Sequence, residues 1–242
     1  MLDAPPVLLV HGFASSFERN WREPGWTDLL AESGREVIGV DLPGHGDGPR
    51  YSDPTEYAAL DEAVEERLPD GPLDAVGFSL GAWVLLRIAA RRPGRFERIV
   101  VGGVGANLFR SEDPEPLARA VETGIAPDGA PEPAAAFARF GQAAGNDRAA
   151  LAAVLRATRE RLDPAELGRI SCPVLVVLGD RDFAGPGRPL VDTLPAGRLL
   201  EIPGLDHFAT PRDFRFLDAA LRFLDRTAPP RPTAGDRRDI DG

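Results

Sequence analysis

The chain has 242 residues, 27% of them charged, and a formal net charge of −10. This length predicts one domain with a sizeable core, and the acidic balance argues against nucleic-acid or membrane-surface partners and favours a small neutral substrate. All 28 basic residues are arginines, which excludes enzymes that need a lysine Schiff base or a lysine-containing phosphate loop.

Short aliphatic runs alternate with helix-like segments along the chain. The clearest runs are VLLV at Val7, EVIGV at Glu36, RIVVGG at Arg98 and PVLVVLG at Pro173, and LDAVGF and GRLLEI are weaker examples. Unbroken hydrophobicity of this kind is typical of strands buried on both faces, as in a parallel sheet. Helices are expected at 26–33, 55–68, 80–92 and 214–226. The alternation predicts an α/β fold with a mainly parallel sheet between helices.

The stretch 105–169 differs in amino-acid composition from the rest of the chain. It is rich in Ala, Pro and Glu, and AAAFARFGQAA and RAALAAVLRATRERL within it indicate helices rather than strands. We predict a helical insertion at 105–169 into a core formed by residues 1–104 and 170–226. The tail at 227–242 has few residues to bury and is predicted to be disordered.

No leader or membrane span is expected, because Met1 is followed almost at once by a strand-like run and no apolar run approaches about 18 residues. The expected location is therefore the cytoplasm. The single cysteine, Cys172, cannot form an internal disulfide and is interpreted as a packed thiol. No cofactor or metal is expected, since the three histidines lie in separate loops and GGVGAN at 102–107 lacks the third glycine of a dinucleotide fingerprint.

Ser79 lies in GFSLG, between the strand-like LDAVGF and a helix-like run. The pattern GxSxG at a strand-to-helix turn is typical of a nucleophile elbow, where Gly77 and Gly81 avoid collisions around a strained serine. The hydroxyl is then exposed at a helix N-terminus, where the Leu80 amide faces a developing oxyanion. The loop HGF after the first strand offers the Phe13 amide as a second donor.

A serine hydroxyl is a weak nucleophile unless a base accepts its proton. His207 follows the last strand-like run and comes after the serine and an acid in chain order, as such a base would. His11 and His45 follow the first and second strands and are interpreted as hydrogen-bonded structural residues.

The acid that orients the base is expected just past a strand end, where PVLVVLGDRDF offers Asp180 and Asp182. Asp182 is preferred because it lies two residues further out and can reach a loop from the next strand. Asp180 is interpreted as a residue that caps or bends the turn. Asp206 adjoins His207, but adjacent side chains usually diverge, so it is interpreted as a turn residue.

Taken in order, VLLVHGF, GVDLPGHGDG, GFSLGAW, PVLVVLGDRD and PGLDHF resemble the serine α/β-hydrolase family over Val7 to Phe223. The resemblance implies a sheet of about six strands, because little precedes Val7 where members often carry two edge strands. It also implies that 105–169 forms a lid over the pocket. The implied site residues are nucleophile Ser79, acid Asp182, base His207 and oxyanion donors Phe13 and Leu80.

The expected function is hydrolysis of a small, largely apolar carboxylic ester, lactone or thioester through an acyl-enzyme on Ser79. Two alternatives stay open: a non-catalytic protein that binds a small ligand on the same fold, and a C–C bond hydrolase or lyase with the same three side chains. The related elimination enzyme of the menaquinone pathway has arginine four residues after its serine, and Trp83 at that place counts against this activity. Candidates for an apolar pocket, beside a favoured interpretation as core residues, are Trp21, Trp26, Phe109, Phe137 and Phe140.

Overall fold

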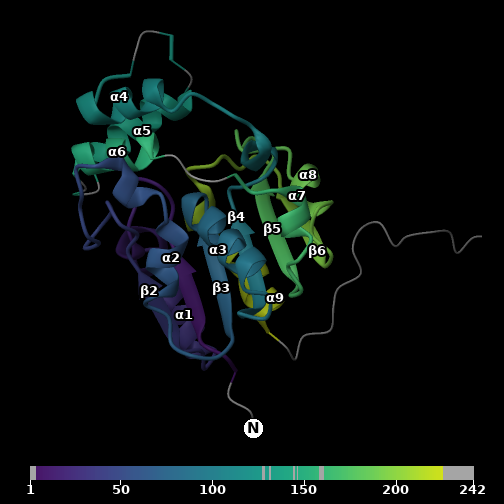
Figure 1. Ribbon diagram of the computed structural model, residues 1–242. Coiled ribbons are helices and arrows are strands. Elements are labelled where there is room, and N and C mark those ends of the chain that lie inside the picture. The colour runs from purple at the N-terminus through teal and green to yellow at the C-terminus, as the bar shows by residue number, and fades with distance from the viewer. Residues whose placement is uncertain are drawn as a thin grey trace, which may run out of the picture.

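The computed structural model describes residues 4–126, 129–130, 132–143, 145, 147–157 and 161–225 (Figure 1). Within these residues, six strands pair in parallel to form one sheet in the order β2-β1-β3-β4-β5-β6. They are β1 (Val7–Val10), β2 (Val37–Val40), β3 (Leu73–Phe78), β4 (Phe96–Gly102), β5 (Val174–Gly179) and β6 (Gly197–Ile202). The α/β architecture is therefore confirmed, with both weaker strand candidates present.

The strand order reverses between β1 and β3. The chain passes from β1 to β2 on one side and then returns to place β3 on the other side of β1, with Val10 paired to Gly77. In an open parallel sheet, the loops that leave the carboxyl ends of the strands at such a reversal diverge and leave a crevice between them. The loops after β1 and β3 therefore leave the same end of the sheet with a crevice between them.

Alternate strand residues face opposite sides, and both sides are covered by helices (Figure 1). Leu8 and Val10 pack with α2 (Leu60–Glu65), α3 (Leu80–Arg91) and α8 (Arg188–Val191). Val7 and Leu9 pack with α1 (Trp26–Glu32) and α9 (Phe214–Leu224). Burial on both faces explains why the strands are continuously hydrophobic rather than alternating.

The helix expected at 55–68 is shorter than predicted and is divided. A 3₁₀ turn, η2 (Pro54–Tyr57), precedes α2, and Ala59 between them is not helical. The buried Tyr57 hydroxyl donates to the Tyr51 carbonyl at 2.8 Å and accepts from the Tyr51 amide at 2.6 Å. These hydrogen bonds to Tyr51 keep residues 54–57 in a separate turn, so that they do not form one continuous helix with α2. Helix propensity alone does not predict this break.

The stretch between β4 and β5 is helical where it is described. It contains η3 (Ala106–Phe109), α4 (Glu115–Thr123), α5 (Glu132–Ala143), α6 (Arg148–Arg156) and α7 (Pro164–Leu167). In Figure 1, α4, α5 and α6 lie together beyond one end of the sheet. Val154, Leu162 and Leu167 belong to the same core cluster as α3, so the last part of the stretch packs on the main core. The domain boundaries at 104 and 170 stay a prediction, and the tail at 227–242 lies outside the described residues.

The helices of the described ranges are all short compared with the thickness of a bilayer. The longest, α3 and α5, have 12 residues each, whereas a membrane-spanning helix needs about 20 apolar residues. None of the helices described is long and apolar enough to cross a membrane.

Candidate active site

Ser79 joins β3 to α3 through a sharp, strained turn. Its φ of 51° and ψ of −110° lie in a region that residues with a side chain rarely adopt. A Cβ atom at Gly81 would lie 2.2 Å from the Val10 carbonyl oxygen, and one at Gly77 would lie 2.7 Å from the Leu85 side chain. The two glycines therefore allow α3 to start directly against β1, as the GxSxG pattern predicts.

Substituting Gly81 with alanine is expected to lower the free energy of unfolding by about 1–3 kcal/mol, because a backbone carbonyl must shift to admit the methyl group. Gly168→Ala is the matched control, since a Cβ there meets its nearest atom at 3.4 Å with φ of −62°. That control should change stability by no more than about 0.5 kcal/mol. Urea unfolding of both variants measures the difference, and equal stabilities would contradict the close approach.

The structure brings the three predicted side chains together from three separate loops. The His207 Nε2 atom lies 3.1 Å from the Ser79 Oγ atom, and its Nδ1 atom lies 2.9 Å and 3.0 Å from the two carboxylate oxygens of Asp182. A carboxylate only accepts, so the Nδ1 atom carries the imidazole proton. This leaves the Nε2 lone pair as the acceptor for the Ser79 hydroxyl.

Asp182 is held in place by a bond of its own. Its side chain is fully buried, and its Oδ1 atom also accepts from the Ala184 amide at 2.8 Å. The Asp180 carboxylate instead accepts from the Gly204 amide at 2.7 Å, and that of Asp206 from the Ala209 amide at 2.9 Å. Asp206 thus bonds within its own turn, as interpreted, whereas Asp180 bonds the loop after β6 and not its own turn.

Four phenylalanine rings surround the His207 imidazole, and sequence reasoning assigned none of them to it. Their centroids lie 4.3 Å from the imidazole for Phe183, 4.9 Å for Phe78, 5.5 Å for Phe208 and 6.4 Å for Phe137. Three of them directly follow or precede Ser79, Asp182 or His207 in the sequence, which is the signal that could have revealed them. The rings exclude water and strengthen the electrostatic interactions of the imidazole.

The loop after β1 is fixed by its own polar contacts. The His11 Nδ1 atom donates to the Gly12 carbonyl at 2.8 Å, its Nε2 atom accepts from the Leu42 amide at 3.0 Å, and the Gly12 amide donates to the Asn20 side chain at 2.8 Å. Burial lowers the pKa of His11, which keeps it neutral. His11 is thus a structural histidine, as expected.

His45 and the two proposed amide donors complete the surroundings of this loop. His45 is buried, donates to the Pro43 carbonyl at 3.0 Å, and packs edge-on against Phe13. Among the residues that the structure describes, no acceptor takes the amide of Phe13 or Leu80. Both amides are therefore available to a substrate oxygen.

Comparison with known proteins places this arrangement in a family. Residues 7–226 match the sequence model of the alpha/beta hydrolase family. The chain belongs to the alpha/beta hydrolase family. A pimeloyl-acyl-carrier-protein methyl ester esterase of Aromatoleum aromaticum is 34% identical over 199 residues, which cover 75% of this chain and 73% of that protein.

Another relative of this alpha/beta hydrolase matches over a smaller share of its length. The esterase of the same name from Neisseria meningitidis serogroup C is 36% identical over 115 residues, which is 46% of this chain and 42% of that protein. The chain thus spans less than half of that relative. Among solved structures, the esterase EaEST from Exiguobacterium antarcticum has a TM-score of 0.72, with 16% identity over 91% of each chain, and shares the fold.

A cavity of about 280 Å³ in this alpha/beta hydrolase opens beside Ser79 and His207. Phe137 and Phe140, both on α5, line it, which is the pocket role and not the favoured interpretation as core residues. Its other aromatic lining residues are Phe13, Phe78 and Phe208, and its polar lining residues include Ser15, Arg19, Asn20 and Arg212. The helical stretch between β4 and β5 therefore contributes part of the cavity wall.

Three of the predicted pocket aromatics do not line this cavity. Trp21 and Trp26 are fully buried with their rings edge to face at 4.9 Å, and Trp26 packs in the same way on Phe216 of α9. Phe109 packs against the core cluster that contains α3. The favoured interpretation of these three as core residues is confirmed, because the two faces of the sheet need large apolar side chains of the same kind as a pocket does.

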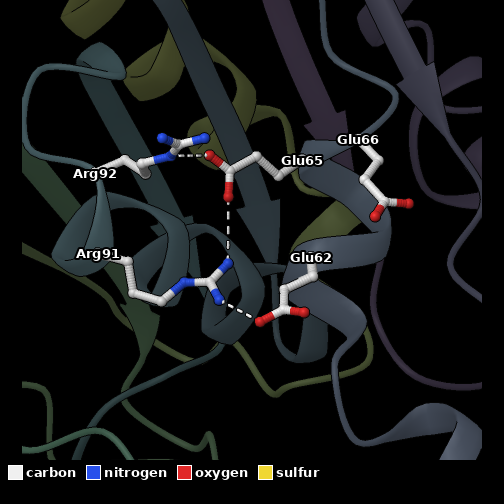
Figure 2. Close-up of a pocket in the computed structure, with 5 residues that line it drawn as sticks. All are labelled: Glu62, Glu65, Glu66, Arg91 and Arg92. Carbon is white, nitrogen blue, oxygen red and sulfur yellow. Dashed lines mark hydrogen bonds and ion pairs between the residues drawn. The ribbon is translucent and has the colours of Figure 1, made fainter.

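A second hollow, of about 470 Å³, lies between α2 and α3 (Figure 2). Arg91 pairs with Glu62 at 2.7 Å and with Glu65 at 3.2 Å, and Arg92 pairs with Glu65 at 2.6 Å. Arg91 ends the helix that begins beside Ser79, so it lies about 18 Å from the elbow at 1.5 Å per residue. The lining residues are glutamates and arginines that neutralise one another, which makes this hollow a poor candidate for the active site.

Other reactive groups of this alpha/beta hydrolase do not form a second centre. Burial raises the pKa of Cys172 to about 11, so the thiol stays protonated at neutral pH and is a packed residue, as interpreted. Within the described part of the chain, no three His, Cys, Asp or Glu side chains are arranged to hold a metal ion.

Proposed function

We propose that this alpha/beta hydrolase cleaves small, largely apolar carboxylic esters through an acyl-enzyme on Ser79. The observation that carries the proposal is the single imidazole, His207, placed between the Ser79 hydroxyl and the buried Asp182 carboxylate at the wall of a cavity. The relatives named as methyl ester esterases support an ester rather than another carbonyl substrate.

Acylation begins when the ester lies in the cavity with its carbonyl carbon at the Ser79 Oγ atom. His207 accepts the hydroxyl proton on Nε2 as Oγ attacks, and Asp182 stabilises the imidazolium through Nδ1. The carbonyl oxygen becomes an oxyanion that the Phe13 and Leu80 amides stabilise. When the tetrahedral intermediate collapses, the C–O bond to the alcohol breaks and His207 returns its proton to the leaving oxygen.

Deacylation repeats the same steps with water as the nucleophile. His207 accepts a proton from the water as the water oxygen attacks the acyl carbon. The second tetrahedral intermediate then releases the carboxylic acid, and His207 returns the proton to Ser79. Every proton moves through one imidazole, so the reaction needs only protein side chains and water.

Labelling with a fluorophosphonate tests the assignment of the nucleophile. Trypsin should release residues 68–87 as one peptide, and Ser79 is the only hydroxyl side chain in it. We expect stoichiometric labelling of this peptide together with loss of ester hydrolysis. Labelling of other peptides, or full activity after labelling, would contradict the proposal.

Methyl esters of straight-chain acids of increasing length test the substrate class. Each methylene buried against the phenylalanine rings contributes about 0.8 kcal/mol, so kcat/KM should rise about fourfold per carbon until the cavity is full, and then fall. Lactone, thioester and 1,3-diketone substrates of similar size, with product analysis, separate the alternative chemistries. Ligand binding without any product would instead support a binding protein.

A further inference from the structure

The cavity beside Ser79 has one polar wall, and hydrolysis of a neutral ester uses none of it. Arg19 and Asn20 in this wall belong to a short π-helix, η1 (Glu18–Arg22), and Arg212 ends the turn η4 (Thr210–Arg212). Arg212 is exposed and already paired with Glu23 at 2.6 Å. Arg19 is the cation of the wall that is free to meet a substrate.

The guanidinium of Arg19 has no acceptor among the described residues, although the side chain is only partly exposed. This sets it apart from the other arginines of the described ranges that are not fully exposed. Each of those has a carboxylate or carbonyl partner: Arg35, Arg87, Arg95, Arg98, Arg148, Arg156 and Arg215. Because Arg19 lines the cavity and its guanidinium has no acceptor in the described residues, an anion that enters the cavity can form charge-assisted hydrogen bonds with it.

Asn20 adds a second donor to the same wall. Its Oδ1 atom accepts from the Gly12 amide at 2.8 Å, and an amide N–H can only bond the oxygen of a carboxamide. The free end of this buried side chain is therefore its Nδ2 group, and no acceptor in the described residues takes it. Arg19 and Asn20 together offer the cavity donors and no acceptor.

We infer that the ester cleaved at Ser79 carries a second, anionic group, which binds Arg19 and Asn20. The inference rests on the proposed function and specifies its substrate class: the acyl chain lies along the phenylalanine wall and ends in an anion. A planar guanidinium matches the two oxygens of a carboxylate, and it also binds phosphate or phosphonate. The overall net charge of −10 does not favour an anionic substrate. The local cation Arg19 provides the selectivity for an anionic group.

Paired substrates test the inference by turnover. Monomethyl adipate and methyl hexanoate have the same acyl length and differ only in the terminal carboxylate, and methyl 5-phosphonopentanoate replaces that carboxylate with a phosphonate. Wild type should prefer one of the charged esters. Arg19→Gln should lower kcat/KM for that ester about 10- to 100-fold, as expected for lost hydrogen bonds to an ion, and change the neutral ester less than about threefold.

Arg22→Gln is the matched control in the same helix. Arg22 pairs with Glu18, its side chain is 61% exposed, and it does not line the cavity. Its substitution should leave both rates within about threefold. An equal loss on charged and neutral esters in Arg19→Gln, or no preference for a charged ester in wild type, would overturn the inference.

Calorimetry separates this inference from the proposed hydrolysis. Adipate and 5-phosphonopentanoate are titrated into Ser79→Ala and into the Ser79→Ala, Arg19→Gln double variant. Binding of either anion that weakens about 10-fold or more without Arg19 supports the anion site even where no ester is hydrolysed. Absence of binding, or equal binding by both proteins, overturns it even where neutral esters are turned over.

Discussion

Ser79→Ala is expected to lower kcat/KM for ester hydrolysis by about 10⁴-fold or more, because the reaction loses the atom that becomes acylated. The residual rate comes from the remaining oxyanion donors and from substrate binding. The fold should persist, since alanine carries the same Cβ atom through the strained turn and only the Oγ atom is removed. Initial rates on a methyl ester, with circular dichroism and thermal unfolding of the same samples, measure both effects.

Ser33→Ala serves as the control for this substitution. Ser33 follows α1, where its hydroxyl donates to the Leu30 carbonyl at 2.7 Å, and it does not line the cavity. Its activity should equal that of wild type. A Ser79→Ala protein that keeps more than a tenth of the wild-type rate would exclude Ser79 as the nucleophile.

Asp182→Asn is expected to lower kcat about 10⁴-fold, because it moves the imidazole proton of His207 from Nδ1 to Nε2. The Ala184 amide donates to Oδ1 of this side chain, so an asparagine must keep its oxygen there and turn its NH₂ group toward His207. The Nδ1 atom must then accept, and the imidazole proton moves to Nε2. An imidazole with its proton on Nε2 cannot accept the proton of the Ser79 hydroxyl.

Asp180→Asn is the matched control, because it makes the same chemical change two residues away. Its Oδ1 atom accepts from the Gly204 amide and asparagine keeps that acceptor. We expect kcat within about threefold of wild type for Asp180→Asn. Comparable losses in the two variants, in assays at several pH values, would contradict the assignment of Asp182 as the partner of His207.

The reactive residues were predictable because their signals are local or follow chain order. Ser79 lies between two glycines at a strand-to-helix junction, and the steric reason for that spacing acts within a few residues. His207 and Asp182 each come just past the end of a strand, and parallel strands bring such ends to one edge of a sheet. Their proximity in the folded protein could therefore be predicted, although they are far apart in the sequence.

Reach alone does not separate Asp180 from Asp182, because the structure brings both carboxylates to the loop after β6. Both residues follow β5, and the preference for Asp182 depended only on its longer distance from the strand. The structure shows that the nearer residue meets the Gly204 amide instead. Both carboxylates therefore reach the loop that follows β6, Asp180 at its start and Asp182 at His207.

The pocket was less predictable than the reactive groups. Trp21 and Trp26 were as suitable as Phe137 by residue type, yet they pack between the sheet and α9. Hydrophobicity indicates burial without indicating which side of a sheet, or which cavity, a ring will occupy. The directions in which η1 and α5 leave the core decided which aromatic side chains pack on the sheet and which line the cavity.

The sequence by itself determined the parallel α/β sheet, the elbow at Ser79 and the candidates for its base and acid, because buried strands, paired glycines and strand-end polar residues leave local patterns. Only the tertiary structure decided which rings enclose His207 and which arginine faces the cavity without an acceptor. Those properties depend on contacts between segments distant in the chain. Nothing in the sequence distinguishes Arg19 from the other 27 arginines as the one that lines the cavity without an acceptor in the described residues.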